Sequence, residues 1–351
     1  MDGAYYCSPS FGCDLAGTFI KLTGIMKPLA IKKILVIALN NVGDVILNTA
    51  VISLLRDHFP SSHLGVLVGT RGEPVLRGSR TIDRIFLYNK RASLWKKVRL
   101  VANLRKEKFD LVVDLKNTSI PFLLGARYRT PLGLDRSLPL MREQHLSRLK
   151  FLMPVTFEER NRFDFFSADE EHSAFEKLKQ RMGPKSISDF IVIALGARMG
   201  LKRWTISGFS ETARYFISRG RTIVIVGGVD DSWLVSEMER RVRFPIVNLV
   251  SLLTLRELAA LVYHASLVLA NDSALLHLAL ELDRPAVGLF GPTDEAKCGR
   301  RGARFKKIRL LLNCAPCELT QCKLERRICL DDLSADQVIR SCEELLNGTF
   351  H

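Results

Sequence analysis

The segment from Val268 to Asp294 contains the residues whose types and spacing are best suited to chemistry. An apolar run, LVLA, leads through Asp272 and Ser273 into a stretch typical of a helix, Ala274 to Glu281. A strand that feeds directly into a helix leaves backbone N–H groups unpaired at the helix start, where a phosphate or diphosphate can bind. His277 follows Ser273 by four residues and therefore lies on the same helix face. We expect an anion site here. The alternative is that these side chains only cap the helix or satisfy one another.

Asp44 stands in a second loop of this kind, which follows the apolar run Lys33 to Leu39. Gly43 permits a tight backbone turn, and a carboxylate at the start of the next helix could take a proton from an incoming hydroxyl group. The alternative is that Asp44 is only a helix cap. Neither G-x-G-x-x-G nor G-x-x-x-x-G-K-[ST] occurs in this loop, which argues against a nicotinamide, flavin or P-loop ATPase site.

Two further loops at predicted strand ends carry groups suited to a diphosphate. Lys202 and Arg203 follow the predicted strand Phe190 to Leu195, and two cations placed there can neutralise such a group. Gly228 follows another strand and offers a close approach to the backbone. A solvated basic turn and an ordinary glycine turn are the alternatives.

Alternating strands and helices must position these loops. Continuous apolar runs predict strands covered on both faces, and a polar helical connector, Asp169 to Met182, interrupts the alternation. The pattern predicts an α/β protein in which two doubly wound, Rossmann-like parallel-sheet domains face a central cleft. We place an N-terminal extension at 1–30, an N-terminal domain with the connector at 31–184 and a C-terminal domain at 185–351.

The individual elements can be predicted from the same pattern. Predicted strands are 33–39, 64–69, 84–88, 110–114, 190–195, 222–226, 245–248, 267–270 and 286–290, with a short strand and turn in 126–134; predicted helices are 44–58, 94–106, 169–182, 207–219, 231–241, 255–264, 274–281 and 335–346. Ligands of parallel sheets bind at the C-terminal ends of the strands. We therefore expect Asp44, Lys202, Gly228 and Asp272 to converge on one cleft.

The composition favours an acidic partner. The 351 residues carry a formal net charge of +15, which suits nucleic acid, anionic lipid headgroups or phosphorylated substrates, although a solvated basic surface is the alternative. The basic clusters at 96–105 and 300–309 are scattered and lack a recognised binding motif, so we expect no nucleic-acid partner. No apolar run is long enough to span a bilayer, and residues 1–30 lack the pattern of a secretory signal. We therefore expect a cytoplasmic protein, whose true start could be Met26.

Four cysteines form a separate cluster in the sequence. Cys314, Cys317, Cys322 and Cys329 have the spacing C-x2-C-x4-C-x6-C, which fits no standard zinc template closely. Free structural thiols, a bound metal or cluster, and a disulfide all remain open interpretations of this segment, 314–329.

Four stretches of the chain resemble the ADP-heptose:lipopolysaccharide heptosyltransferases, glycosyltransferase family 9. They are KILVIALNNVGDVILNTAVISLLRDHFP, FDLVVDLKNTSIPFLLGARYRTPLGLD, LKRWTISGFSETARYF and LVLANDSALLHLALELDRPAVGLFGPTD, and the likeness runs from about Ile31 to the C-terminal helix. The resemblance implies a GT-B fold with an acceptor-binding first domain and a nucleotide-sugar-binding second domain. It also implies an inverting transfer, independent of metal and cofactors, of a heptose-type sugar to a lipid-linked lipopolysaccharide core.

The resemblance also implies roles for individual residues. The general base falls on Asp44, and Gly43, Lys90 and Lys96 are the expected acceptor-binding residues. The cations Lys90 and Lys96 would also suit the anionic inner leaflet of the inner membrane, where we expect peripheral attachment. The expected donor-binding residues are Lys202, Leu253, Asp272, Ser273, Ala274, Leu275 and His277, and Trp204 completes the K-x-W motif.

Several positions depart from the family pattern. Ala274 stands where glycine is usual, Arg198 replaces a small hydroxyl residue whose role its charge could take over, and Leu252 and Lys116 also differ. These changes concern the identity of donor and acceptor more than the reaction class. The competing interpretations are a catalytically silent nucleotide-sugar-binding protein and a GT-B enzyme with another sugar, acceptor or reaction, such as an epimerase.

Overall fold

A computed structural model describes residues 31–133, 135, 137–158, 160–183 and 189–348. The predicted extension 1–30, with the alternative start Met26, lies outside the described residues. None of the described helices has both the length and the apolar character that crossing a membrane requires.

The first half of the chain builds a parallel sheet with the strand order β3-β2-β1-β4-β5. The strands are β1 (Lys33–Ile37), β2 (His63–Gly69), β3 (Arg84–Tyr88), β4 (Leu111–Asp114) and β5 (Tyr128–Arg129). The central strand is buried on both faces after its first residue, as the continuous apolar run predicts. In register, Ile34 pairs with Leu64 on one side and with Leu111 on the other.

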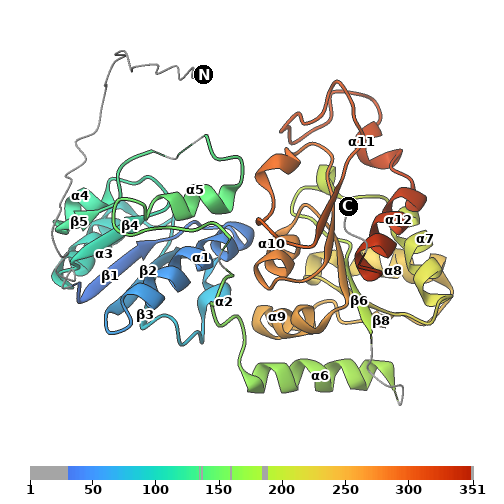
Figure 1. Cartoon of the computed structure of the whole chain (residues 1–351), viewed down its shortest axis with the longest axis horizontal. Coiled ribbons are helices and arrows are strands. Elements are labelled where there is room, and N and C mark those ends of the chain that lie inside the picture. The colour runs from blue at the N-terminus through green and yellow to red at the C-terminus, as the bar shows by residue number, and fades with distance from the viewer. Residues whose placement is uncertain (1–30, 134, 136, 159, 184–188, 349–351) are drawn as a thin grey trace, which may run out of the picture. The chain divides into compact units, whose positions relative to one another are not determined.

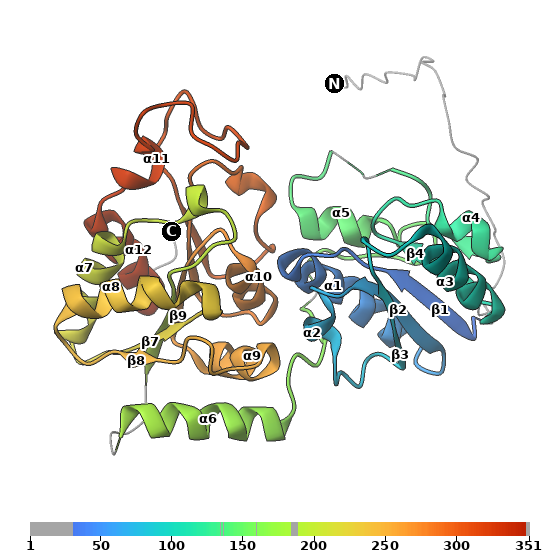
Figure 2. The same cartoon turned by 180° about the vertical axis from the view of Figure 1, so that it is seen from behind.

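Helices cover both faces of this sheet (Figures 1 and 2). They are α1 (Val42–His58), α2 (Glu73–Leu76), α3 (Leu94–Lys106), α4 (Ile120–Leu124) and α5 (Met141–Ser147). Every residue of α1 from Val45 to Leu55 is buried, which makes α1 the central helix of this half. By contrast, Leu104 is the one fully buried residue of α3.

The second half repeats the architecture around a six-stranded parallel sheet with the order β11-β10-β9-β6-β7-β8. Its strands are β6 (Phe190–Ala194), β7 (Thr222–Val226), β8 (Val247–Asn248), β9 (Leu267–Asn271), β10 (Ala286–Leu289) and β11 (Phe305–Ile308). Its helices are α7 (Ile206–Ile217), α8 (Ser232–Val242), α9 (Leu255–His264), α10 (Ala274–Glu281), α11 (Ile328–Asp331) and α12 (Ala335–Leu346), with 3-10 turns η1 (Gly200–Lys202), η2 (Val229–Asp231) and η3 (Glu295–Lys297). Two parallel-sheet α/β domains are thus present, which confirms the predicted fold class.

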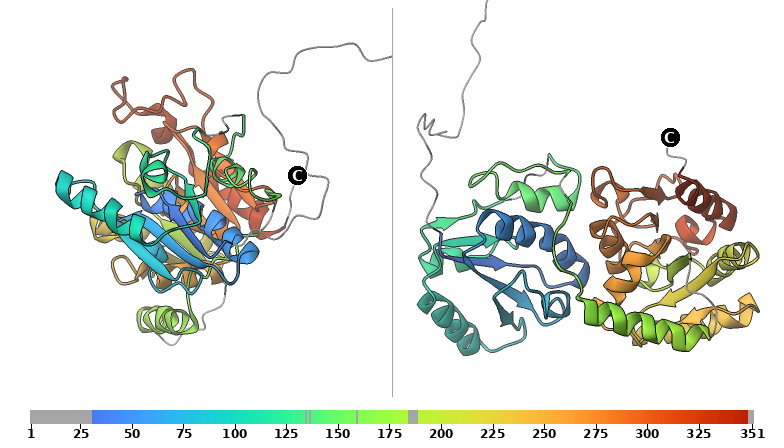
Figure 3. Two further views of the ribbon diagram at one scale, coloured as in Figure 1. Left: turned by 90° about the vertical axis from the view of Figure 1, so that its left-hand side faces the viewer. Right: turned by 60° about the horizontal axis from the view of Figure 1, so that its bottom comes forward.

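The connector helix α6 (Ala168–Met182) packs against α9 of the second half, and both views of Figure 3 show it outside the two sheets. Ser167 begins it with a reciprocal capping box to Glu170, which satisfies two otherwise unpaired donors. The predicted domain boundary after residue 184 adjoins segment 184–188, which lies outside the described residues, so the boundary stays a prediction.

Element bounds differ from the predicted ones mainly where side chains replace backbone pairing. The first strand ends at Ile37 rather than Leu39, because the Leu39 amide donates to Asn48 Oδ1 at 3.0 Å. The predicted helix start at Asp44 is also late, since α1 begins at Val42. The short elements α2, α4, α5, α11 and β11 were not predicted, because four to seven residues carry too little periodicity.

Candidate functional site

The loop after β1 places Asp44 in the first turn of α1 rather than at its cap. Asn41 is the N-cap residue, and its side-chain amide donates to Asp44 Oδ2 at 2.8 Å. Asp44 is therefore not the N-cap residue, although a carboxylate in the first turn also favours the helix dipole. Its half-buried position leaves it available to a ligand at the edge of the sheet.

The loop after β9 forms the second part of the site. Ser273 is the N-cap residue of α10 but makes no side-chain cap bond, and its Oγ is buried without a hydrogen-bond partner among the described residues. A buried hydroxyl without a partner at a helix N-terminus is a feature of a binding site rather than of a stable cap. The backbone N–H groups of α10 add a favourable dipole for an anion at this point.

Asp272 does not cap α10 either. Its Oδ2 accepts from Lys202 Nζ at 2.6 Å and from Thr293 Oγ1 at 2.8 Å. Burial acts to raise the pKa of Asp272, but the hydrogen bond and charge of Lys202 outweigh it and hold the pKa below its ordinary value. Asp272 therefore fixes the ammonium group of Lys202 beside the start of α10.

His277 of α10 lies beside the N-terminal end of α1. Burial lowers its pKa, against the opposing charges of Asp272, Asp44 and Glu281, so the imidazole is neutral near pH 7 and can donate one hydrogen bond. A Cβ atom at Gly43 would lie 3.1 Å from Cδ2 of His277. The absence of a side chain at Gly43 thus allows α1 and α10 to approach closely at their N-terminal ends.

These groups border a cavity of about 980 Å³ that both halves of the chain line. This volume lies at the upper end of the range for small-molecule and cofactor sites. The lining contains, among others, Gly43, Lys202, Gly228, Leu253, Asp272, Ser273, Ala274, Leu275 and His277, whereas Asp44 adjoins it without lining it. The structure therefore brings the predicted strand-end residues together.

Lys90 and Lys96 are not brought to this cavity. Both side chains are exposed, Lys90 after β3 and Lys96 in the first turn of α3, and neither lines the cavity. Their acceptor-binding role stays a prediction.

Sequence reasoning missed several residues of the cavity. Arg71, which follows β2, contributes a further cation, and the rule that loops after parallel strands carry the site could have found it. Arg198, which the sequence does single out, reaches across the cavity, where its Nη1 donates to Asn41 Oδ1 at 2.7 Å, a contact that the sequence does not predict. The carboxylate of Asp231 lies against Gly196, which follows β6. A Cβ atom at Gly196 would come within 2.2 Å of Asp231 Oδ1, so any side chain there would displace this carboxylate.

Trp204 of the K-x-W motif packs into the core beside α7. It is buried, its ring lies 4.9 Å from that of Phe209 on α7, and its indole N–H donates to the Leu333 carbonyl at 3.0 Å. This anchoring fixes the turn that carries Lys202.

A smaller cavity of about 180 Å³ lies at the C-terminal edge of the first sheet. Lys116 and Tyr88 line it, and the ammonium group of Lys116 stands 4.8 Å from the centre of the Tyr88 ring. Burial lowers the pKa of Lys116, and the charge of Lys90 adds to this effect while Asp114 opposes it. An anion in this cavity would relieve the repulsion between the two lysines.

The four clustered cysteines line a third cavity of about 360 Å³ next to η1. All four are free thiols, so the structure contains no disulfide there. No group of three or more side chains among the described residues is arranged to hold a metal ion. The segment nevertheless supports the turn that carries Lys202, because Arg327 donates to the Gly200 carbonyl of η1 at 2.9 Å.

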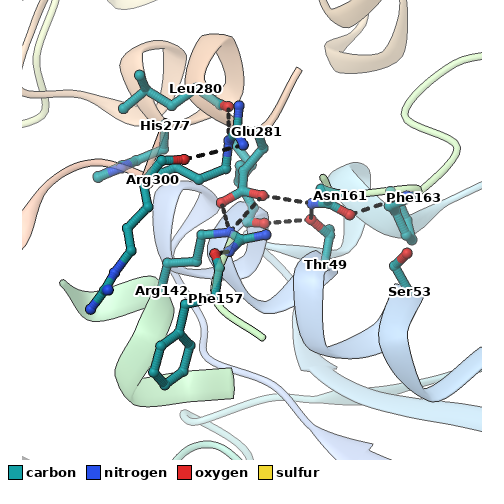
Figure 4. Close-up of polar contacts among 12 residues, drawn as sticks. Thr49, Ser53, Arg142, Phe157, Asn161, Phe163, His277, Leu280, Glu281 and Arg300 are labelled. Carbon is teal, nitrogen blue, oxygen red and sulfur yellow. Dashed lines mark hydrogen bonds and ion pairs between the residues drawn. The ribbon is translucent and has the colours of Figure 1, made fainter. Parts of the chain in front are cut away.

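A buried polar network joins the halves behind the large cavity (Figure 4). Arg142 of α5 and Glu281 of α10 form an ion pair at 3.0 Å, and their side chains are 2% and 1% exposed. The amide of Asn161 donates both to Glu281 Oε2, at 2.8 Å, and to Thr49 Oγ1 of α1, at 2.7 Å. Glu281 lies one turn after His277, so this network fixes the helix that carries the imidazole.

Comparisons with known proteins agree on the kind of protein that carries such a site. The family model of glycosyltransferase family 9 (heptosyltransferase) matches residues 97–328. Lipopolysaccharide heptosyltransferase 3 of Escherichia coli is 28% identical over 278 residues, which cover 72% of this chain and 81% of that protein.

Two solved structures have the same fold. The glycosyl transferase family 9 protein from Veillonella parvula DSM 2008 has a TM-score of 0.76 at 21% identity and covers 92% of this chain and 99% of its own. The E. coli ADP-heptose lps heptosyltransferase II has a TM-score of 0.71 at 21% identity and covers 90% of this chain and 99% of its own.

Proposed function

Because the chain belongs to glycosyltransferase family 9, the heptosyltransferase family, we propose that it transfers a heptose-type sugar from a nucleotide diphosphate donor, ADP-heptose, to a lipopolysaccharide core. The observation that carries this proposal is the cavity itself. One wall holds the N-terminus of α10 with the partnerless Ser273 Oγ and the fixed Lys202, and the opposite wall begins with Gly43 and borders Asp44.

The donor diphosphate would bind at the start of α10. Lys202 and the N–H groups of α10 would stabilise the charge that develops as the bond between the sugar and the diphosphate breaks. Arg198 lines the same cavity and would exchange its contact with Asn41 for one with the diphosphate. Neutral His277 would donate a hydrogen bond to the same group or to the sugar. Leu253 would line the nucleotide base.

The acceptor hydroxyl group would approach from the N-terminal half. Asp44 would take its proton while the oxygen attacks the anomeric carbon from the face opposite the leaving diphosphate, which inverts the configuration. Gly43 lines the cavity beside Asp44, where the acceptor would lie, and Lys90, Lys96 and the small cavity at Lys116 offer positive charge to its anionic groups. Such an acceptor is held in a membrane, so we also propose that the protein works at the inner face of the inner membrane.

Replacing Asp44 tests this proposal. Asp44→Asn keeps the shape and the contact with Asn41 but removes the base, so we expect transfer to fall between about 100- and 10,000-fold. The affinity for ADP, measured by calorimetry, should stay within about twofold, because Asp44 adjoins the cavity without lining it.

Asp57→Asn is the matched control. Asp57 lies on the same helix, where it faces Arg162 at the surface, so this variant should transfer at the wild-type rate. If Asp44→Asn transfers sugar as fast as Asp57→Asn does, Asp44 is not the base.

A further inference from the structure

An apolar surface lies open on α3 and α4 of the N-terminal half. Leu94, Trp95 and Val98 of α3 are 76%, 84% and 51% exposed, and Phe122 and Leu123 of α4 are each 50% exposed. The two helices contact each other, and Figures 1 and 2 both show them side by side. These five exposed apolar residues on two neighbouring helices are here called the α3–α4 face. Exposed apolar groups that gather on one part of a protein can mark an interaction site.

The burial of α3 explains why this face needs a partner. The C-terminal half of α3 packs on the protein core, where Leu100 and Val101 contact the buried cluster that includes Leu104. The first two turns bury no residue fully, yet they hold the apolar side chains at Leu94, Trp95 and Val98. A helix with apolar residues beyond its core-facing side is typical of segments that lie in a membrane interface.

The two sequence segments that carry the α3–α4 face hold charges of one sign only. The sequence holds eight cations and no carboxylate between Asp83 and Glu107, and three cations and no carboxylate between Asp114 and Asp135. Arg129 stacks over the Phe122 ring at 4.6 Å, so one of these cations lies directly on the face. A second copy of the chain would bring like charges together here, whereas an anionic lipid surface would neutralise them.

The position of the face relates it to the site. The helices α1, α3 and α4 follow β1, β3 and β4, and these strands are parallel. The start of each helix therefore lies at the same edge of the sheet. Leu94 and Trp95 thus stand at the edge where Gly43 and Asp44 meet the large cavity.

We propose that the α3–α4 face docks on an anionic bilayer, with Leu94, Trp95 and Phe122 entering the interface and the surrounding cations contacting lipid headgroups. This inference rests on the proposed function in one respect, namely that the same bilayer would hold the acceptor. Aromatic side chains prefer the headgroup level of a membrane, and each cation near an anionic surface adds attraction that salt weakens.

Vesicle binding of the full chain tests the proposal without any transfer reaction. The probes are vesicles of phosphatidylethanolamine and phosphatidylglycerol, and vesicles of phosphatidylcholine alone. Trp95→Ala should lower the partition coefficient on the anionic vesicles about tenfold or more, since a large apolar side chain leaves the interface. The matched control is Trp233→Ala, because Trp233 is also exposed, at 59%, but lies on α8 of the other half.

A charge variant and a spectroscopic readout complete the experiment. Lys97→Gln/Arg99→Gln should weaken binding to the anionic vesicles alone, and the difference from wild type should shrink as salt rises. In the Trp233→Phe protein the only other tryptophan, Trp204, is buried, so a blue shift and quenching by brominated lipid would report the entry of Trp95 into the interface.

Three results would overturn the proposal. They are equal binding by Trp95→Ala and Trp233→Ala, equal binding of wild type to both kinds of vesicle, and a dimer in sedimentation that Trp95→Ala abolishes. The last result would assign the face to a second copy of the chain. A wild-type protein that binds vesicles but transfers no sugar would instead contradict the proposed function and leave the docking face intact.

Discussion

At the scale of single residues, His145 is the most unusual group near the proposed base. It lies on α5, is 1% exposed, and neither ring nitrogen has a hydrogen-bond partner among the described residues. Burial lowers the pKa of His145 to about 4, with a smaller contribution from Arg148, while the charge of Asp44 opposes the shift. Folding therefore holds a neutral imidazole close to the carboxylate.

His145 should make stability depend on pH. The pKa of an unfolded histidine is about 6.5, so below that pH the unfolded chain binds a proton that the folded protein resists until about pH 4. The stabilisation is complete above about pH 6.5 and is lost as the pH falls toward 4. His145→Leu should lose less stability over this range than wild type, by roughly 3 kcal/mol.

Urea unfolding at pH 7, 5.5 and 4.5 measures this difference. Wild type and His145→Leu also share every other titrating group, so the difference between their pH profiles isolates His145. Parallel profiles for the two proteins would show that the imidazole is not held neutral.

Sequence reasoning can select single residues of the site but not the contacts that their side chains make. Loop position alone was enough to select Gly43, Lys202, Asp272 and Ser273, because strand ends of parallel sheets converge. The partners of these side chains were not predictable from the sequence. Arg198 and Asn41, for example, are 157 positions apart and meet only because two separate loops face each other.

At the scale of elements, the buried Arg142–Glu281 pair ties α5 to α10. Removing one partner leaves a buried charge without compensation, and such changes cost about 3–5 kcal/mol. We therefore expect Arg142→Met to lower the unfolding free energy by that amount, and Arg142→Met/Glu281→Leu to recover most of the loss, because two apolar side chains can fill the same space.

Denaturant unfolding of the single and double variants checks this expectation. The control is Lys179→Met, which breaks an exposed ion pair with Glu176 within α6 and should cost less than about 1 kcal/mol. A double variant as unstable as Arg142→Met would mean that the network does more than pair two charges.

Elements differ in how well the sequence predicts them. The bounds of α3, α9, α10 and α12 were predicted to the residue, because each is an amphipathic or apolar run of two turns or more with clear ends. The five-residue helix α4 was missed, although it carries two of the five residues of the α3–α4 face. A segment of that length has no period to detect, and only its contact with α3 gives it a role.

At the scale of the whole molecule, ligand binding should stabilise both halves together, because both line the large cavity. A ligand that binds only the native state at 100 times its Kd adds about 2.7 kcal/mol. We therefore expect ADP-heptose to raise the Tm by several degrees, and UDP-, GDP- and CMP-linked sugars to raise it less.

Lys202→Met should abolish most of this shift, since Lys202 is the cation that Asp272 holds beside α10. Differential scanning fluorimetry with the four nucleotide sugars gives the ranking. A larger shift with UDP- or GDP-linked sugars would assign the donor to another nucleotide, while leaving the membership of the family unchanged.

The close approach of α1 and α10 at Gly43 also bears on how this fold could be recombined. The proposed base belongs to one half of the chain and the leaving-group site to the other, so a chimera that exchanges the second half would exchange the sugar and keep the acceptor. Such a hybrid would inherit a working geometry only if the glycine opposite His277, the Arg142–Glu281 pair and the Asn161 amide were transplanted as one unit. We therefore expect the contacts between the halves, more than either sheet, to decide whether such a hybrid is active.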